Sequence, residues 1–242
     1  MEAHRIGRNF MVSTWLKCAA SAFAKTSQSL ALELNLSAKQ TAEVDSLFAS
    51  RKEHLAGMLA SLTANETEDP HEALRQITAL VRNKGLRTDL AGILTSEQLA
   101  TFDAAEANRQ REAIETKTHS DMAAVNAVLT LTASQKPVVL AALSARAAEK
   151  VEEEADARAI MSLSYGEMSA VIDLSNVRGL AGALNENLDD VPDFAYGSTE
   201  YHRWMENQRA ERIGSELSPL RHILDENQFA HYREYLEVKS PR

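Results

Sequence analysis

Residues 90–102 read LAGILTSEQLATF, and residues 220–232 read LRHILDENQFAHY. The two segments align without a gap. In each, a Leu (Leu94 or Leu224) is followed directly by a Thr or Asp, and a Gln comes three residues after that Thr or Asp. An aromatic residue ends each segment. A Thr or Asp at the N-cap of a helix accepts a hydrogen bond from the backbone N–H three residues on, and a Gln at that position bonds back to the N-cap N–H. Each segment therefore predicts a helix that begins at its Thr or Asp.

The same Leu-[Ser/Thr/Asp]-x-x-Gln motif occurs four times in the chain. In two copies the leading Leu can pack on an apolar residue across the helix start, Leu94 on Leu99 and Leu224 on Phe229. In the third copy Pro137 removes one backbone donor, so the helix start can shift to Ser134. We interpret the motif residues as helix caps rather than as ligands. They are Leu36, Ser37, Gln40, Leu94, Thr95, Gln98, Leu131, Thr132, Gln135, Leu224, Asp225 and Gln228.

Apolar residues recur at three- and four-residue steps over long stretches, which predicts an all-α protein. One stripe runs from Val44 to Leu62, and a second from Leu99 to Leu129. The second has a polar middle at residues 108–112, which predicts one long helix exposed between two packed ends. The charged run 149–158 predicts a solvated helix face. Only 5 prolines, 9 glycines and 5% aromatic residues favour helices over a β-sandwich.

The order of the motifs predicts an internal duplication. Residues 90–102 match residues 220–232, and the first and third motifs each open a long charged helix. We expect Leu94, Leu99 and Phe102 to be buried in one unit, and Leu224, Phe229 and Tyr232 in the other. The expected parts are an N-terminal segment over 1–26, a first helical unit over 27–130 and a second over 131–242.

The motif resembles that of the LTxxQ-motif proteins, which include the periplasmic stress chaperones Spy and CpxP and zinc-resistance-associated relatives. The resemblance covers about residues 36–238. It implies long bent helical hairpins, here as two Spy/CpxP-like units, and ATP-independent holding of misfolded clients. Two motifs per chain and a dimeric cradle are usual in that family, so four motifs imply a monomeric pseudo-dimer, with a homodimer as the alternative. The net charge of −9 departs from the basic concave surface associated with Spy.

Charge and composition exclude several classes of site. The net charge of −9 argues against nucleic-acid binding, because phosphate neutralisation needs a basic face. Cys18 is the only cysteine, so neither an internal disulfide nor a zinc site with two thiolates can form. His202 with Glu206, and His222 with Glu226, have helical spacing but supply two ligands each. We expect no metal site and no cofactor.

Catalytic motifs are absent from the sequence, which predicts a binding protein rather than an enzyme. There is no Gly-rich phosphate loop, no Gly-x-Ser-x-Gly turn and no His-Glu-x-x-His motif. Residues 188–198 form the longest predicted loop, after a short amphipathic helix marked by Leu180, Leu184 and Leu188. The helix expected next carries Tyr201, Trp204 and Met205, which are either local core or an apolar contact surface for clients.

Two interpretations of residues 1–26 stay open. A positive region with His4, Arg5 and Arg8, the apolar run 10–23 and the Ala22-Phe23-Ala24 sequence are typical of a signal peptide and its cleavage site. Lys17 interrupts the run, and the alternative is an amphipathic segment or a tail. No later stretch approaches the ~18 apolar residues that a membrane span needs, so we expect no membrane insertion of the mature chain.

The resemblance to the Spy and CpxP group, together with the missing catalytic motifs, implies a periplasmic, ATP-independent chaperone-like or stress-response protein that binds unfolded or partner proteins on a helical surface. The alternative function is that of a structural or sensor module that binds one partner. A third, less favoured function is that of a metal-responsive protein. An exposed apolar concave face would favour the first, and a flat charged exterior the second.

Overall fold

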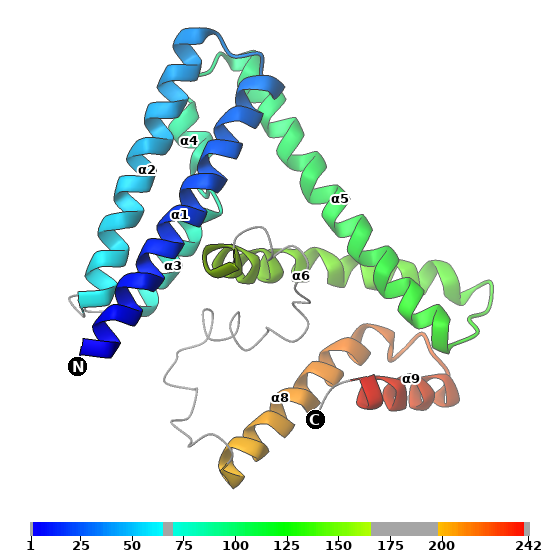
Figure 1. Cartoon of the computed structure of the whole chain (residues 1–242). Helices are drawn as coiled ribbons and strands as arrows, with labels where there is room; N and C mark the ends of the chain where they lie inside the picture. The colour runs from blue at the N-terminus through cyan, green and yellow to red at the C-terminus, as the bar shows by residue number, and fades with distance from the viewer. Residues whose placement is uncertain (1, 65–69, 166–197, 240–242) are drawn as a thin grey trace. The chain divides into compact units, whose positions relative to one another are not determined.

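A computed structural model describes residues 2–64, 70–165 and 198–239. These residues form helices and turns without any strand, and long bent helices are present, which confirms the all-α prediction. The loop predicted over 188–198, except for Ser198, and the predicted amphipathic helix with Leu180, Leu184 and Leu188 lie outside the described residues. The helices in chain order are α1 (Glu2–Glu33), α2 (Ala38–Ala64), α3 (Pro70–Val81), α4 (Leu86–Leu90), α5 (Ser96–Val128), α6 (Gln135–Tyr165), α8 (Thr199–Leu217), the 3₁₀ helix η4 (Ser218–Leu220) and α9 (Glu226–Lys239) (Figure 1).

The chain divides into two compact units. The described residues within 1–108 and 153–188 belong to unit 1, and those within 109–152 and 189–242 belong to unit 2. The boundary expected between residues 130 and 131 lies inside unit 2. Both α5 and α6 therefore begin in one unit and end in the other. Across the described ranges, no helix is both long enough and apolar enough to traverse a lipid bilayer.

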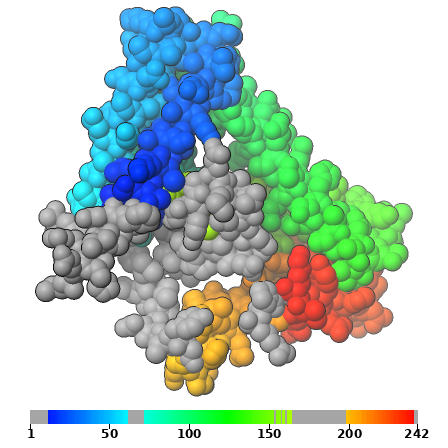
Figure 2. All heavy atoms as spheres, in the orientation of Figure 1, coloured from blue at the N-terminus to red at the C-terminus, as the bar shows by residue number. Residues whose placement is uncertain are grey.

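Unit 1 is built on the antiparallel pair α1 and α2, which pack against each other and appear as one blue-to-cyan body in the space-filling view (Figures 1 and 2). Its core contains Val44, Leu55 and Leu59, which are 0% exposed. Phe23 of α1 is 2% exposed and its ring centroid lies 5.6 Å from that of Phe48 in α2. The described part of the N-terminal segment is thus helical and contributes side chains to this core.

Unit 2 has a separate core. Its buried side chains come from the second half of α5, the first half of α6, and the three C-terminal helices α8, η4 and α9. Val125, Val139 and Leu220 are 0% exposed. Because α5 and α6 serve both units, each helix is packed at its two ends against different cores.

The middle of α5 is exposed, as its polar sequence predicts. Every residue from 106 to 113 is exposed, whereas Phe102 before it and Val125 after it are buried in different units. The charged run in α6 differs in part from expectation. Glu149 and Glu152 are exposed, but the Asp156 carboxylate is only 21% exposed and forms ion pairs in unit 1.

Candidate functional site

The four LTxxQ-like motifs all lie at helix N-termini. Helices α2, α5 and α9 begin one residue after Ser37, Thr95 and Asp225. In each motif the Gln backbone N–H donates to the cap side chain, at 3.3 Å for Ser37, 3.2 Å for Thr95, 3.2 Å for Thr132 and 2.8 Å for Asp225. The Gln Oε1 accepts from the cap backbone N–H at 3.0 to 3.1 Å in all four. These are the two reciprocal bonds of a capping box.

The third motif combines this cap with a later helix start. Thr132 makes both capping bonds, yet regular α-helix begins only at Gln135. Pro137 has no N–H with which to close the first turn on residue 133, which accounts for the delay. The expected shift towards Ser134 and the cap at Thr132 thus occur together.

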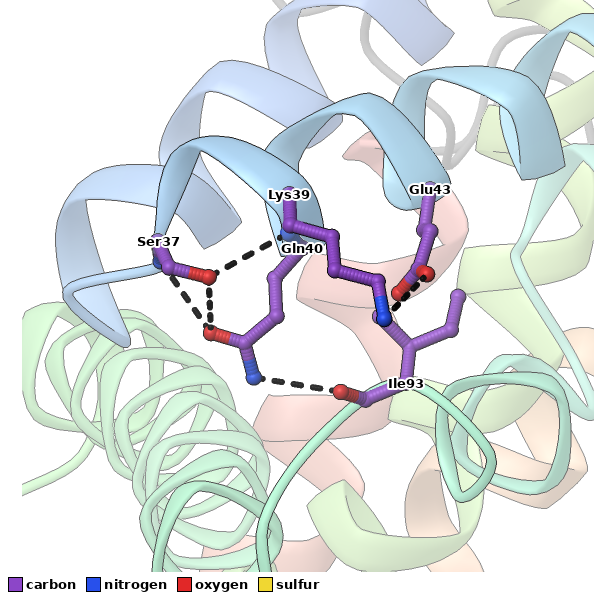
Figure 3. A network of polar contacts seen from close by, with 5 residues as sticks. All are labelled: Ser37, Lys39, Gln40, Glu43 and Ile93. Carbon is purple, nitrogen blue, oxygen red and sulfur yellow. Dashed lines mark hydrogen bonds and ion pairs between the residues drawn. The ribbon is translucent and has the colours of Figure 1, made fainter.

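The glutamines of the first two motifs also bind each other. Gln40 Nε2 donates to Gln98 Oε1 at 2.7 Å, and Gln98 Nε2 approaches Gln40 Oε1 at 3.4 Å. Each amide reaches the loop before the other motif as well: Gln40 Nε2 donates to Ile93 O at 3.1 Å, and Gln98 Nε2 to Leu34 O at 3.2 Å (Figure 3 shows the Ser37, Gln40 and Ile93 bonds). We call this arrangement of two paired glutamines a glutamine clasp.

Unit 2 contains a second glutamine clasp with the same bonds. Gln135 Nε2 donates to Gln228 Oε1 at 2.7 Å, and Gln228 Nε2 to Gln135 Oε1 at 3.3 Å. The loop contacts recur too, from Gln135 Nε2 to Ile223 O at 3.1 Å and from Gln228 Nε2 to Thr130 O at 3.0 Å. Each clasp joins two helix starts that are far apart in sequence but belong to one unit.

Only a side chain with both a donor and an acceptor, at this length, can form a clasp. The Oε1 atom accepts from the cap N–H and from the partner amide, while Nε2 donates to a backbone carbonyl and to the partner. Glutamate lacks the donor, and asparagine is one methylene shorter. The clasp thus satisfies backbone groups at two helix ends with one pair of side chains. Both glutamine amides are engaged in these hydrogen bonds rather than available to bind a ligand.

The segments 90–102 and 220–232 occupy matching environments. Their burial classes agree at every position, from Leu90 and Leu220, both 0% exposed, to Phe102 and Tyr232, at 6% and 5%. Leu94 and Leu224 are both 8% exposed. The leucine and phenylalanine that follow the glutamines, expected to be buried, are half-buried in both segments because they lie at the edge of each core.

One buried arginine, Arg51, and one largely buried arginine, Arg146, were not foreseen from the sequence. Arg51 is 7% exposed; its Nη2 donates to Lys84 O at 3.1 Å and lies 3.3 Å from Asp89 Oδ2. Arg146 lies 3.8 Å from Glu216 Oε1 in unit 2, with its side chain 10% exposed. Burial lowers the pKa of Arg51, and the Asp89 charge opposes this.

A sequence signal for these arginines does exist. Each stands 11 residues after a motif glutamine, Gln40 or Gln135, which is about three helical turns and keeps both side chains on one helix face. Arginine is rarely buried without a partner, and so composition alone favours a surface position. The partner acids lie at different distances from the motifs, which conceals the pairing in the sequence.

Tyr232 lies beside the Arg146 pair in unit 2. Burial raises the pKa of Tyr232 to about 12, and the negative charge of Glu216 adds to this rise while Arg146 opposes it. In unit 1 the matching position is Phe102. Loss of the Tyr232 proton is therefore less favourable in the folded protein than in an exposed tyrosine.

The proposed client-contact residues lie on α8. Tyr201 and Trp204 are half-buried, with ring centroids 6.4 Å apart, and Met205 is 44% exposed. The large apolar side chains that are exposed in the described ranges are spread over several helices: Leu32, Val138, Leu140, Met205 and Val238.

Metal ligands do not converge in the part of the chain that the structure describes. There, no group of three or more His, Cys, Asp or Glu side chains is placed to hold an ion. Ser198 caps α8 by accepting a hydrogen bond from the Tyr201 N–H at 3.1 Å, and His202 packs edge-on against the Tyr201 ring at 5.8 Å between centroids.

Known protein-family models, curated protein sequences and solved structures yield no match to this chain.

Proposed function

We propose that this chain is an ATP-independent, chaperone-like or stress-response protein of the periplasm that binds unfolded or partner proteins reversibly on its helical surface. The observation that carries the proposal is the glutamine clasp, present once in each unit. The motif side chains that carry the resemblance to the Spy and CpxP group are engaged in joining helix ends. Binding therefore falls to the outer faces of the helices rather than to a pocket of motif residues.

The surface best suited to apolar contact is the N-terminal part of α8. Met205 is exposed on this helix, and a methionine side chain adapts to partners of different shape. Tyr201 and Trp204 lie within one turn of it and present half-exposed aromatic rings. Weak apolar contact with fast dissociation suits transient holding of clients, and the acidic chain remains soluble while doing so.

An aggregation assay without nucleotide tests the proposal. The purified chain should slow the aggregation of a chemically unfolded substrate in proportion to its concentration. Met205→Glu should weaken this effect, whereas Val238→Glu, a matched change of an exposed apolar residue on α9, should leave it intact. Since the chain is acidic, added salt should weaken the capture of basic substrates more than that of acidic ones. No effect on aggregation at equimolar protein would refute the proposal.

A second candidate function is a structural or sensor module that binds a single partner. The scatter of exposed apolar side chains over several helices, within the described ranges, favours this reading over a broad apolar cradle. Such a protein would form one stable complex and would leave the aggregation of unrelated substrates unchanged. A metal-responsive role would instead be revealed by zinc binding in a calorimetric titration.

The two matching clasps also support an internal duplication, in which each unit corresponds to one Spy/CpxP-like hairpin pair. Bond lengths in the two clasps agree within 0.2 Å for every equivalent contact. A chain that already contains two units is expected to be a monomeric pseudo-dimer. Light scattering after size-exclusion chromatography distinguishes this from a homodimer, because the monomer mass is 26.6 kDa.

A further inference from the structure

Helix α6 takes part in two different cores. Its first half carries Val139 and Leu143, which are 0% and 1% exposed in the core of unit 2. Its last turns carry Leu163, which is 1% exposed and belongs to the core cluster of unit 1. We call residues 153–165, the part of α6 that belongs to unit 1, the α6 tail.

The α6 tail buries side chains on more than one face of the helix. Leu143 and Leu163 are 20 residues apart, which places them about 200° apart around a regular helix. Met161, which is 7% exposed, is 18 residues from Leu143 and so lies on the same face as Leu143. Between the two buried stretches, Ala148 and Glu149 are exposed. Helix α6 is therefore a continuous element that connects two separately packed regions.

The α6 tail is held in unit 1 by charge as well as by apolar packing. Arg82 Nη1 lies 2.6 Å from Asp156 Oδ1, and both side chains are largely buried, at 15% and 21% exposed. Lys84 Nζ lies 3.3 Å from the same oxygen. Ion pairs with little solvent exposure are costly to break from one side, because the remaining charge stays buried. Loss of the α6 tail would thus remove both a core side chain and an ion-pair network from unit 1.

We propose that α6 couples the stability of the two units, so that opening of one unit propagates to the other. The start of α6 lies in the unit 2 clasp through Gln135, and its end completes the core of unit 1. When unit 2 opens, the first half of α6 loses its packing, and a helix without packing is only marginally stable in water. The α6 tail then loses its helical support, and unit 1 loses Leu163. A ligand that stabilises either unit would in the same way stabilise both.

The two tryptophans allow a direct test, because each lies in a different unit. Trp15 packs against the core of unit 1, and Trp204 lies on α8 in unit 2. Trp204→Phe leaves a probe of unit 1 alone, and Trp15→Phe leaves a probe of unit 2 alone. Coupled units give coincident urea unfolding curves from both probes, as a single cooperative transition requires. Separate midpoints in these parent proteins would overturn the proposal.

Leu163→Ala in each single-tryptophan background identifies the route of coupling. This change removes a buried side chain from unit 1, and it should lower the midpoint by roughly 1 M urea for both probes. A lowered midpoint for Trp15 alone, with Trp204 unchanged, would show that the α6 tail does not transmit stability and would overturn the proposal.

Glycine substitution in the exposed part of α6 tests the helix itself. Ala148→Gly with Glu149→Gly should weaken the helix between the cores and separate the two midpoints. The matched control is Ala49→Gly with Ser50→Gly, two exposed positions on α2 inside unit 1, which should lower the midpoint but keep the two curves coincident. Midpoints that still coincide in the α6 glycine variant would show that α5, which also joins the two cores, is sufficient for the coupling, and would overturn the assignment to α6. If that variant fails to fold, the Leu163→Ala comparison still decides.

Discussion

Replacement of Gln98 by alanine tests the role of the glutamine clasp. The change removes the acceptor for the Thr95 N–H at 3.0 Å, the donor to Leu34 O at 3.2 Å and both contacts with Gln40, at 2.7 and 3.4 Å. An intramolecular hydrogen bond contributes about 1 kcal/mol net, and less where water can replace the partner, as at the exposed Thr95. The expected loss is about 2–3 kcal/mol of unfolding free energy.

Urea denaturation followed by circular dichroism measures this loss. With a slope of roughly 2 kcal/mol per M, the midpoint should fall by about 1–1.5 M. Gln110→Ala is the matched control, because Gln110 lies on the same helix in its exposed middle. That variant should remain within about 0.5 kcal/mol of the parent. Equal stability of the Gln98→Ala and Gln110→Ala variants would refute the structural role of the clasp.

Gln98→Glu separates the donor from the acceptor. The new carboxylate can still accept from the Thr95 N–H and from Gln40 Nε2, but it turns an oxygen towards Leu34 O and Gln40 Oε1, where Nε2 stood. Two facing acceptors disfavour the charged form, so the pKa of this carboxyl in the folded state is raised. Relative to the parent, the variant should therefore lose stability as the pH rises through that pKa. An absence of added pH dependence relative to the parent would contradict the assigned amide orientation.

Three further predictions concern buried groups. Asp89→Ala should lower the free energy of unfolding by about 1–2 kcal/mol because it leaves the Arg51 guanidinium buried without its ion partner. Arg51→Met should lower it less. Equal losses of the two variants in urea denaturation would contradict this ordering. Burial raises the pKa of Tyr232 to about 12, from an ordinary tyrosine pKa of 10. The stability contributed by the neutral hydroxyl is therefore fully present below pH 10 and is lost as the pH rises towards 12. Tyr232→Phe should therefore gain stability relative to the parent across that range, and the tyrosinate absorbance of the parent should exceed that of the variant only as the pH approaches 12. Phe23→Ala should cost about 3–5 kcal/mol in thermal or urea unfolding, since the ring is 2% exposed; a loss below about 1 kcal/mol would show that α1 does not contribute to the core.

The helix starts could be predicted because capping is local chemistry. The Thr95 hydroxyl and the Gln98 amide hydrogen-bond to backbone groups of the same turn. All groups of this interaction therefore lie within four consecutive residues. The exposed middle of α5 was also predictable, because a helix face without apolar residues has nothing to bury. The all-α class followed from the spacing of apolar residues in the same way.

The pairing of the motifs depended on tertiary structure. Gln40 and Gln98 are 58 residues apart, and Gln135 and Gln228 are 93 apart, so nothing in either motif specifies its partner. Arg51 finds its partners only in the folded chain, where Asp89 of α4 and the Lys84 carbonyl in the turn before α4 contact it. The division of α6 between two cores also depends on tertiary structure. The sequence around Leu143 and Leu163 predicts a helix but does not specify which core each leucine joins. Local hydrogen bonds determine where these helices begin, whereas burial of side chains from distant segments determines which helix ends meet and which core each half of a helix joins.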